Sequence, residues 1–184
     1  RELSNYRMFA IKKRSGGRRF IHAVSENLAT VHRYVNTYIL QKTRPHPCSY
    51  AFHSSGGIRE CAAQHCGARW LLKFDLTDFF YYVTEPRVFR VFQLLGYKDL
   101  LAFELSRLCT TLRVPDQFAG YRTRTRFVDG DFPYSPSFKG LGVAPQGAST
   151  SPMLSNLVAR ELDEVLSGFA DEKCLVYTRY VDDL

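Results

Sequence analysis

Two short apolar runs that each end on aspartates constrain the fold of this chain more than any other feature of its sequence. Residues 70–74 lead directly to Asp75, and the β-prone run 174–181 leads to the adjacent pair Asp182 and Asp183. Such runs are typical of buried strands. Neighbouring side chains on a strand point to opposite faces, so both acids of the pair can face one site only if the chain turns there. A solvated acidic turn is the simpler interpretation, but a second acid at the end of an apolar run favours a two-metal site.

The composition agrees with a folded domain that has a polyanionic partner. Of the 184 residues 45% are hydrophobic, which is enough for a core, and the formal net charge is +7. A basic balance alone is a weak indication of nucleic-acid binding. No run approaches the length of a membrane span, and none resembles a signal peptide. Five cysteines without regular spacing argue against a disulfide framework and favour a reducing cytoplasm.

A basic β-hairpin is expected near the N-terminus. Residues 6–13 and 20–21 flank the turn signal Ser15-Gly16-Gly17. The cations around its tip are Lys12, Lys13, Arg14, Arg18 and Arg19. Two glycines among five cations suit phosphate contact, and a solvated basic tip is an equally good interpretation.

Helical periodicity and capping residues predict four helices. They begin at Ser25, at Pro86, near residue 101 and at Pro152, and Gly96 closes the second of them. The expected apolar stripes are Leu28, Val31, Val35, Tyr38 and Ile39; Val88, Val91, Phe92 and Leu95; Leu101, Leu105, Leu108 and Leu112; and Leu154, Leu157, Val158, Leu162 and Val165. Residues 42–57 should form a loop, and residues 70–76 a strand that is covered on both faces.

Histidines and cysteines gather between residues 46 and 66. They are His46, Cys48, His53, Cys61, His65 and Cys66. Zinc modules usually carry a tight cysteine or histidine pair at each end of the site, and no such arrangement is found here. We therefore favour ordinary loop and core residues over a zinc site.

Two further stretches suit contact with phosphates. Within the Pro- and Gly-rich segment 114–142, Arg122, Arg124 and Arg126 would share one face of a strand, although a charged edge strand is the slightly preferred interpretation for any single arginine. The loop 142–152 carries small residues and Gly147 before a helix N-terminus. Such a loop can hold an anion or a flat ring.

In this order, the hairpin, the first acidic strand, the loop and the acid pair resemble a reverse transcriptase of the bacterial branch. The sequence FDLTDFF at 74–80 is similar to motif A, VAPQGASTSP at 143–152 with SNL at 155–157 to motif B, and YTRYVDDL at 177–184 to motif C. The helix VFRVFQLLGY at 88–97 also looks like the retron helix after motif A. Within the bacterial branch, the chain resembles retron reverse transcriptases most, and group II intron enzymes next.

The resemblance implies an α+β fold, with the fingers and palm of a right-hand polymerase and an antiparallel palm sheet backed by helices. Fingers would span residues 1–69 and the palm 70–184, with 114–142 as an insertion or a return segment to the fingers. Because the chain starts at Arg1 in mid-motif and stops at Leu184, we expect a fragment without the thumb, inactive by itself.

The resemblance also implies residue roles. Asp75, Asp182 and Asp183 would be catalytic and, with the backbone carbonyl of Leu76, would bind two Mg²⁺ ions, with Mn²⁺ as an alternative. The nucleotide would contact Lys13, Arg19, Asp78, Phe79, Phe80 and Gln146, and nucleic acid would contact Gly147, Tyr180, Arg122, Arg124 and Arg126. A bulky Phe80 beneath the ribose would exclude a 2′-hydroxyl, whereas the alternative is that Phe79 and Phe80 are both core.

The expected activity is RNA-directed DNA synthesis, with an RNA template and primer, dNTPs and a structured noncoding RNA as partners, in a bacterial cytoplasm and away from membranes. An intron maturase or an antiphage-defence enzyme is the alternative within the same chemistry. A catalytically silent RNA-binding scaffold is the alternative from another class, and three intact acids argue against it.

Overall fold

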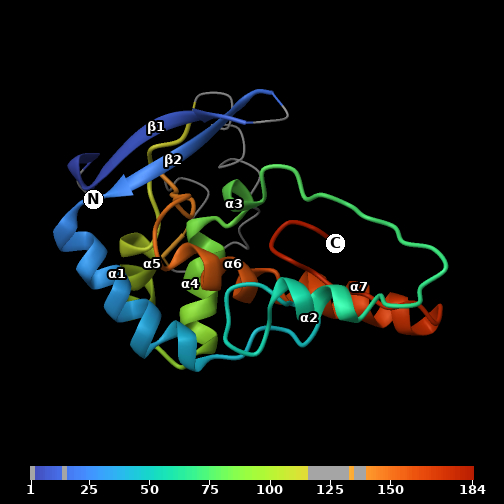
Figure 1. The fold of residues 1–184 in the computed structure, drawn as a ribbon. Helices are drawn as coiled ribbons and strands as arrows, with labels where there is room; N and C mark the ends of the chain where they lie inside the picture. Colours follow the sequence, from blue (N-terminus) through green and yellow to red (C-terminus); the bar gives the residue numbers. More distant parts are fainter. Residues whose placement is uncertain (1–2, 14–15, 116–132, 135–139) are drawn as a thin grey trace.

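The computed structural model describes residues 3–13, 16–115, 133–134 and 140–184 (Figure 1). The described elements are β1 (Tyr6–Lys12), β2 (Arg18–Val24), α1 (Glu26–Tyr38), α2 (Ile58–Ala63), α3 (Phe79–Tyr82), α4 (Glu85–Leu94), α5 (Asp99–Leu108), α6 (Ser151–Val158) and α7 (Arg160–Glu172), with 3₁₀ turns at Leu3–Asn5 and Leu40–Lys42. The fold therefore combines helices with an antiparallel pair of strands. The described helices are all too short or too polar to cross a membrane.

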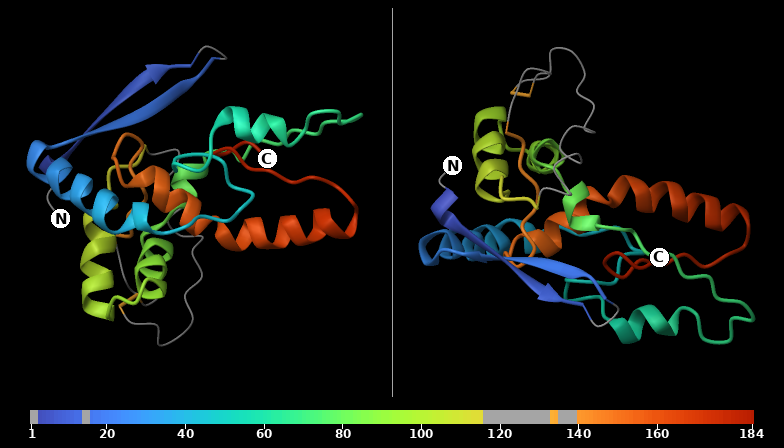
Figure 2. Two further views of the ribbon diagram at one scale, coloured as in Figure 1. Left: turned by 60° about the horizontal axis from the view of Figure 1, so that its bottom comes forward. Right: turned by 90° about the horizontal axis from the view of Figure 1, so that it is seen from above.

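The expected basic hairpin is confirmed. Strands β1 and β2 pair from Tyr6 opposite Val24 to Lys12 opposite Arg18. The hairpin stands clear of the helices in Figure 1 and in the left view of Figure 2. Its base is held to the helical body, because the Tyr6 hydroxyl donates to the Leu108 carbonyl over 3.1 Å.

The core lies among α4, α5 and α6. Val88, Phe92 and Leu154 have no exposed surface and belong to one cluster with Leu40 and Leu105. Pro86 lies in the first turn of α4, and Gly96 follows the helix with a φ of 90°, as the capping pattern predicted.

Several predicted stripes are displaced from the buried face. In α1, Val31 and Tyr38 are exposed, and His32 is buried instead. In α5, Leu101 and Leu108 are exposed while Ala102 and Ser106 are buried. Periodicity identifies one apolar side of a helix, but the neighbouring element decides which part of that side is covered.

The long helix expected after Pro152 is divided. It forms α6 and α7, which meet around Ala159, and Val165 of the predicted stripe is exposed. The arginines Arg122, Arg124 and Arg126 lie outside the described residues, so their prediction is not tested.

The prediction that residues 70–76 form a strand covered on both faces is wrong. Trp70 is 86% exposed and Leu72 is 75% exposed, and among the described residues only the end of the segment forms a β-bridge with another part of the chain. The run 174–181 is likewise only partly buried, because Leu175 and Val176 are exposed. Apolar character favours burial, but burial also requires a neighbour that covers the side chain.

Candidate active site

A tight turn brings the two adjacent acids to one side of the chain. The Tyr180 amide donates to the Asp183 carbonyl over 2.8 Å, and the Asp183 amide donates back over 3.1 Å. Val181 and Asp182 are therefore the two central residues of the turn. Of these two, Val181 has a positive φ, 64°, which is the pattern of a type II′ turn. The expectation that the chain must turn at the acid pair is confirmed.

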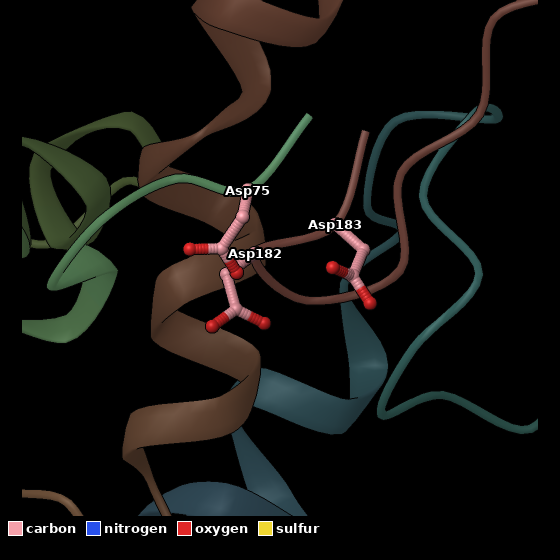
Figure 3. A group of neighbouring side chains, drawn as sticks. All are labelled: Asp75, Asp182 and Asp183. Atoms are coloured by element: carbon pink, nitrogen blue, oxygen red, sulfur yellow. The ribbon is translucent and has the colours of Figure 1, made fainter. Parts of the chain in front are cut away.

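The turn pairs with the end of the first acidic segment. Phe74 and Leu184 exchange backbone hydrogen bonds of 3.0 and 2.8 Å, and the Leu76 amide donates to the Asp182 carbonyl over 2.8 Å. This antiparallel register places Asp75 opposite Asp183. Each of the three aspartates offers a carboxylate oxygen, and these oxygens lie within 4.8 Å of one another. Figure 3 shows Asp75 and Asp182 close together, with Asp183 to one side.

Burial and neighbouring charges both affect the acids. Burial raises the pKa of Asp182, and the charges of Asp75 and Asp183 raise it further, while a backbone hydrogen bond and the Arg19 guanidinium lower it. The Lys73 ammonium contacts Asp183 over 3.0 Å, and this hydrogen bond raises the pKa of Lys73. Three hard oxygen ligands in a partly desolvated cluster fit a divalent cation such as Mg²⁺.

The residues that follow Asp75 form a short helical turn. Asp78 has a φ of 56° at the start of α3, and its side chain does not cap the helix. Phe79 is buried, and its ring meets the half-buried Phe80 ring edge-on, with 5.8 Å between the ring centroids. Of the two phenylalanines, Phe79 is therefore the more buried.

The loop before α6 is held against the basic hairpin. The His22 amide donates to the Gln146 carbonyl over 2.7 Å. Gly147 has a φ of 116°, and a Cβ atom there would lie 2.7 Å from the His22 carbonyl oxygen. Glycine is needed at this position because the protein's own strand approaches the loop backbone. On the hairpin, Lys13 and Arg19 are exposed.

A set of polar residues beneath the turn was not predicted from the sequence. Arg179, Asp163 and Asn156 are fully buried, and Arg179 donates hydrogen bonds to both of the others. The signal in the sequence is an arginine inside an otherwise apolar run, since a buried charge requires a partner.

The histidines and cysteines weighed for zinc make other contacts. His65 Nε2 and Cys61 Sγ lie 2.7 and 3.5 Å from the Thr178 hydroxyl, and His46 contacts Glu164. Among the residues that the structure describes, the group that could hold a metal is the aspartate cluster.

Comparison with known proteins identifies the family. The family model described as reverse transcriptase (RNA-dependent DNA polymerase) matches residues 11–184. The retron Ec86 reverse transcriptase of Escherichia coli is 33% identical over 97% of this chain and 48% of its own length. The retron Mx65 and Mx162 reverse transcriptases of Myxococcus xanthus are 37% and 32% identical over 98% of this chain, which covers 40% and 35% of their lengths.

The chain thus spans about half the length, or less, of these curated relatives. The three motifs that carried the resemblance all lie inside the matched region. The expectation of similarity to bacterial retron enzymes is confirmed. The chain belongs to the reverse transcriptase family of RNA-dependent DNA polymerases.

Proposed function

We propose that the protein is an RNA-directed DNA polymerase of the retron type, which extends a primer with dNTPs on an RNA template. The observation that carries the proposal is the meeting of Asp75, Asp182 and Asp183, whose carboxylate oxygens lie within 4.8 Å of one another. Membership of the family and similarity to retron enzymes support this choice of substrate class.

The fingers would comprise residues 1–69, with the basic hairpin, and the palm would comprise residues 70–184. The register between Phe74 and Leu184 supports an antiparallel palm sheet that begins at the acidic site. Helices α6 and α7 would back this sheet.

Asp75 and Asp182 would be the shared ligands of two Mg²⁺ or Mn²⁺ ions, with Asp183 and the Leu76 carbonyl completing the set. Burial and the charges of Asp75 and Asp183 raise the pKa of Asp182, and the repulsion among these charges supports cation binding, because a cation removes it. When bound, the ions neutralise the charge on the attacking and leaving oxygens.

In the reaction, the primer 3′-oxygen forms a bond to the α-phosphorus of the dNTP, the 3′-hydroxyl loses its proton, and the α–β bridging P–O bond breaks to release pyrophosphate. The chain's own contribution is positioning and charge. Lys13 and Arg19 would hold the triphosphate, and the effect of Arg19 on the pKa of Asp182 supports its position near the site.

The remaining contacts follow from the loop and the turn. The nucleotide would meet Asp78, Phe79 and Gln146, with Phe80 beneath the ribose, where a bulky ring excludes a 2′-hydroxyl. Template and primer would contact Gly147, Tyr180, Arg122, Arg124 and Arg126, and a structured noncoding RNA would be a further partner.

The test is labelled dNTP incorporation by the full-length protein on an RNA template with a DNA primer, with Mg²⁺ and separately with Mn²⁺. Extension that depends on the divalent cation is expected, and no incorporation with either ion would contradict the activity. Sequencing the nucleic acid that co-purifies would test the subclass, since intron RNA would replace the retron assignment with the intron alternative.

A further inference from the structure

Beneath the acidic turn, the Arg179 side chain is enclosed by polar partners. Its Nε and Nη2 atoms donate to the two oxygens of Asp163, each over 2.7 Å, and the three side chains of Arg179, Asp163 and Asn156 are fully buried. Its Nη1 donates to Asn156 Oδ1 over 3.1 Å and to the Val181 carbonyl over 2.9 Å. We call these three side chains and the Val181 carbonyl the Arg179 cluster.

The Val181 carbonyl belongs to the central peptide of the turn that carries Asp182. Rotation of the central peptide is what converts one type of β-turn into another. Val181 also holds a φ of 64°, a left-handed conformation that β-branched residues strongly disfavour. A fixed donor on this carbonyl therefore opposes the relaxation that the Val181 backbone would otherwise favour.

The donor itself is fixed from several elements. Asp163 lies on α7 and also accepts a 2.9 Å hydrogen bond from the Tyr177 hydroxyl. Asn156 lies on α6 and donates to the Ala51 carbonyl over 2.7 Å. A planar guanidinium held at three edges has one orientation, which a lysine ammonium cannot reproduce.

We propose that Arg179 is a positioning residue of the active site: held by Asp163 and Asn156, it fixes the central peptide of the turn and so keeps Asp182 beside Asp75. This inference deepens the proposed function and rests on it. A purely structural ion pair would stabilise the fold without affecting the acids, so the two roles differ in what they do to cation binding.

The test measures Mn²⁺ binding to the full-length protein by electron paramagnetic resonance, together with thermal unfolding. Arg179→Lys keeps a positive charge for Asp163 but cannot make the four hydrogen bonds of the guanidinium. Mn²⁺ affinity should fall by about tenfold or more, the size of effect known for residues that orient metal ligands. Tyr177→Phe is the matched control, because it removes a bond to the same Asp163 without touching the turn. Its Mn²⁺ affinity should match the wild type.

A rescue variant separates turn geometry from general damage. Glycine adopts a positive φ without strain. When Val181→Gly is combined with Arg179→Lys in one protein, it should therefore restore much of the Mn²⁺ affinity that Arg179→Lys alone loses. If Arg179→Lys fails to fold, Asn156→Ala takes its place, because it removes one partner of Nη1 and leaves the pair with Asp163 intact. Weaker Mn²⁺ binding is expected again.

The outcomes distinguish the two proposals. Wild-type affinity in Arg179→Lys, or in Asn156→Ala where the first variant does not fold, would overturn the positioning role. The positioning role would also be overturned if Arg179→Lys loses Mn²⁺ affinity and the added Val181→Gly does not restore it. The substitution Asp75→Asn tests the metal site itself. If the wild type binds no Mn²⁺, or if Asp75→Asn leaves its Mn²⁺ binding unchanged, the metal site of the proposed function is contradicted instead.

Discussion

The acidic site has two sides of opposite character. On the covered side, Val143 bridges Thr84 and Thr111, and the loop continues into α6, where Met153 and Leu154 are buried. On the open side, exposed apolar side chains line a cavity of about 730 Å³; they include Leu71, Leu72, Phe74, Leu175 and Val176. The chain's C-terminal residues lie between the segment before Asp75 and helix α7 in Figures 1 and 2.

Both sides are apolar in sequence, so the difference between them shows what apolar character leaves undetermined. Ala144, Met153 and Leu154 are covered because they pack in one cluster with residues of α4 and α5. The buried Glu85 carboxylate also accepts a hydrogen bond from the Gly142 amide over 2.9 Å. On the open side, among the described residues, Asp75 is held in place only by the backbone hydrogen bonds of its neighbours Phe74 and Leu76. An exposed apolar patch of this kind is typical of an interaction surface.

The largest effect should come from Asp182→Ala. If Asp182 acts in catalysis, primer extension should fall by on the order of 10³-fold. If the covered side provides most of the stability of the fold, the unfolding temperature should not fall. Asp171→Ala removes an exposed acid from α7 and is the control. A variant that still extends a primer would remove Asp182 from the catalytic set.

A pair of leucines compares the two sides directly. Leu154→Ala on the covered side should cost about 2–5 kcal/mol in the free energy of unfolding, because it leaves a cavity in the core. Leu72→Ala on the open side should cost less than about 1 kcal/mol. Denaturant unfolding of both variants in the full-length protein measures the difference. Equal losses would mean that the open side is covered in the folded protein.

Phe80 is half-buried and lies next to the buried Phe79. If its ring excludes the 2′-hydroxyl, Phe80→Ala should raise ribonucleotide use relative to dNTP use by about tenfold or more in primer extension. Phe103→Ala, in α5, is the control for a lost ring elsewhere. Unchanged sugar selectivity would leave Phe80 with a packing role only.

The smallest effect concerns the charge of Asp182. The pKa of Asp182 is raised in the folded state, so the folded protein binds this proton more tightly than the unfolded chain does. The free energy of unfolding therefore falls as the pH rises from about 4 through the raised pKa. With chelator present, Asp182→Asn should therefore unfold at a higher temperature than the wild type at pH 7, with the difference vanishing near pH 4. Adding Mg²⁺ should stabilise the wild type alone. A less stable Asn variant at pH 7 would contradict this balance.

Local chemistry made part of the fold predictable. Gly16 and Gly17 identified the hairpin, Pro86 and Gly96 bounded α4, and the need for a turn at the acid pair followed from strand geometry alone. These features depend on a few adjacent residues.

Long-range pairing could not be predicted in the same way. Nothing near Arg179 in the chain indicates that Asp163 and Asn156 would enclose it, and nothing near Leu72 indicates whether a neighbour covers it. For Gly147, the sequence indicated close approach by another molecule, and it did not indicate that His22 of the same chain approaches this glycine as well. Each of these depends on residues distant in sequence.

The attachment of the basic hairpin has a mechanical consequence. Its base is hydrogen-bonded to the rest of the chain through Tyr6 and His22, while its tip is exposed. An isolated two-stranded hairpin is only marginally stable in water, so this hairpin depends on the contacts at its base. Because the His22 amide is hydrogen-bonded to the Gln146 carbonyl, any movement of the hairpin that shifts Lys13 and Arg19 would be transmitted to the loop before α6.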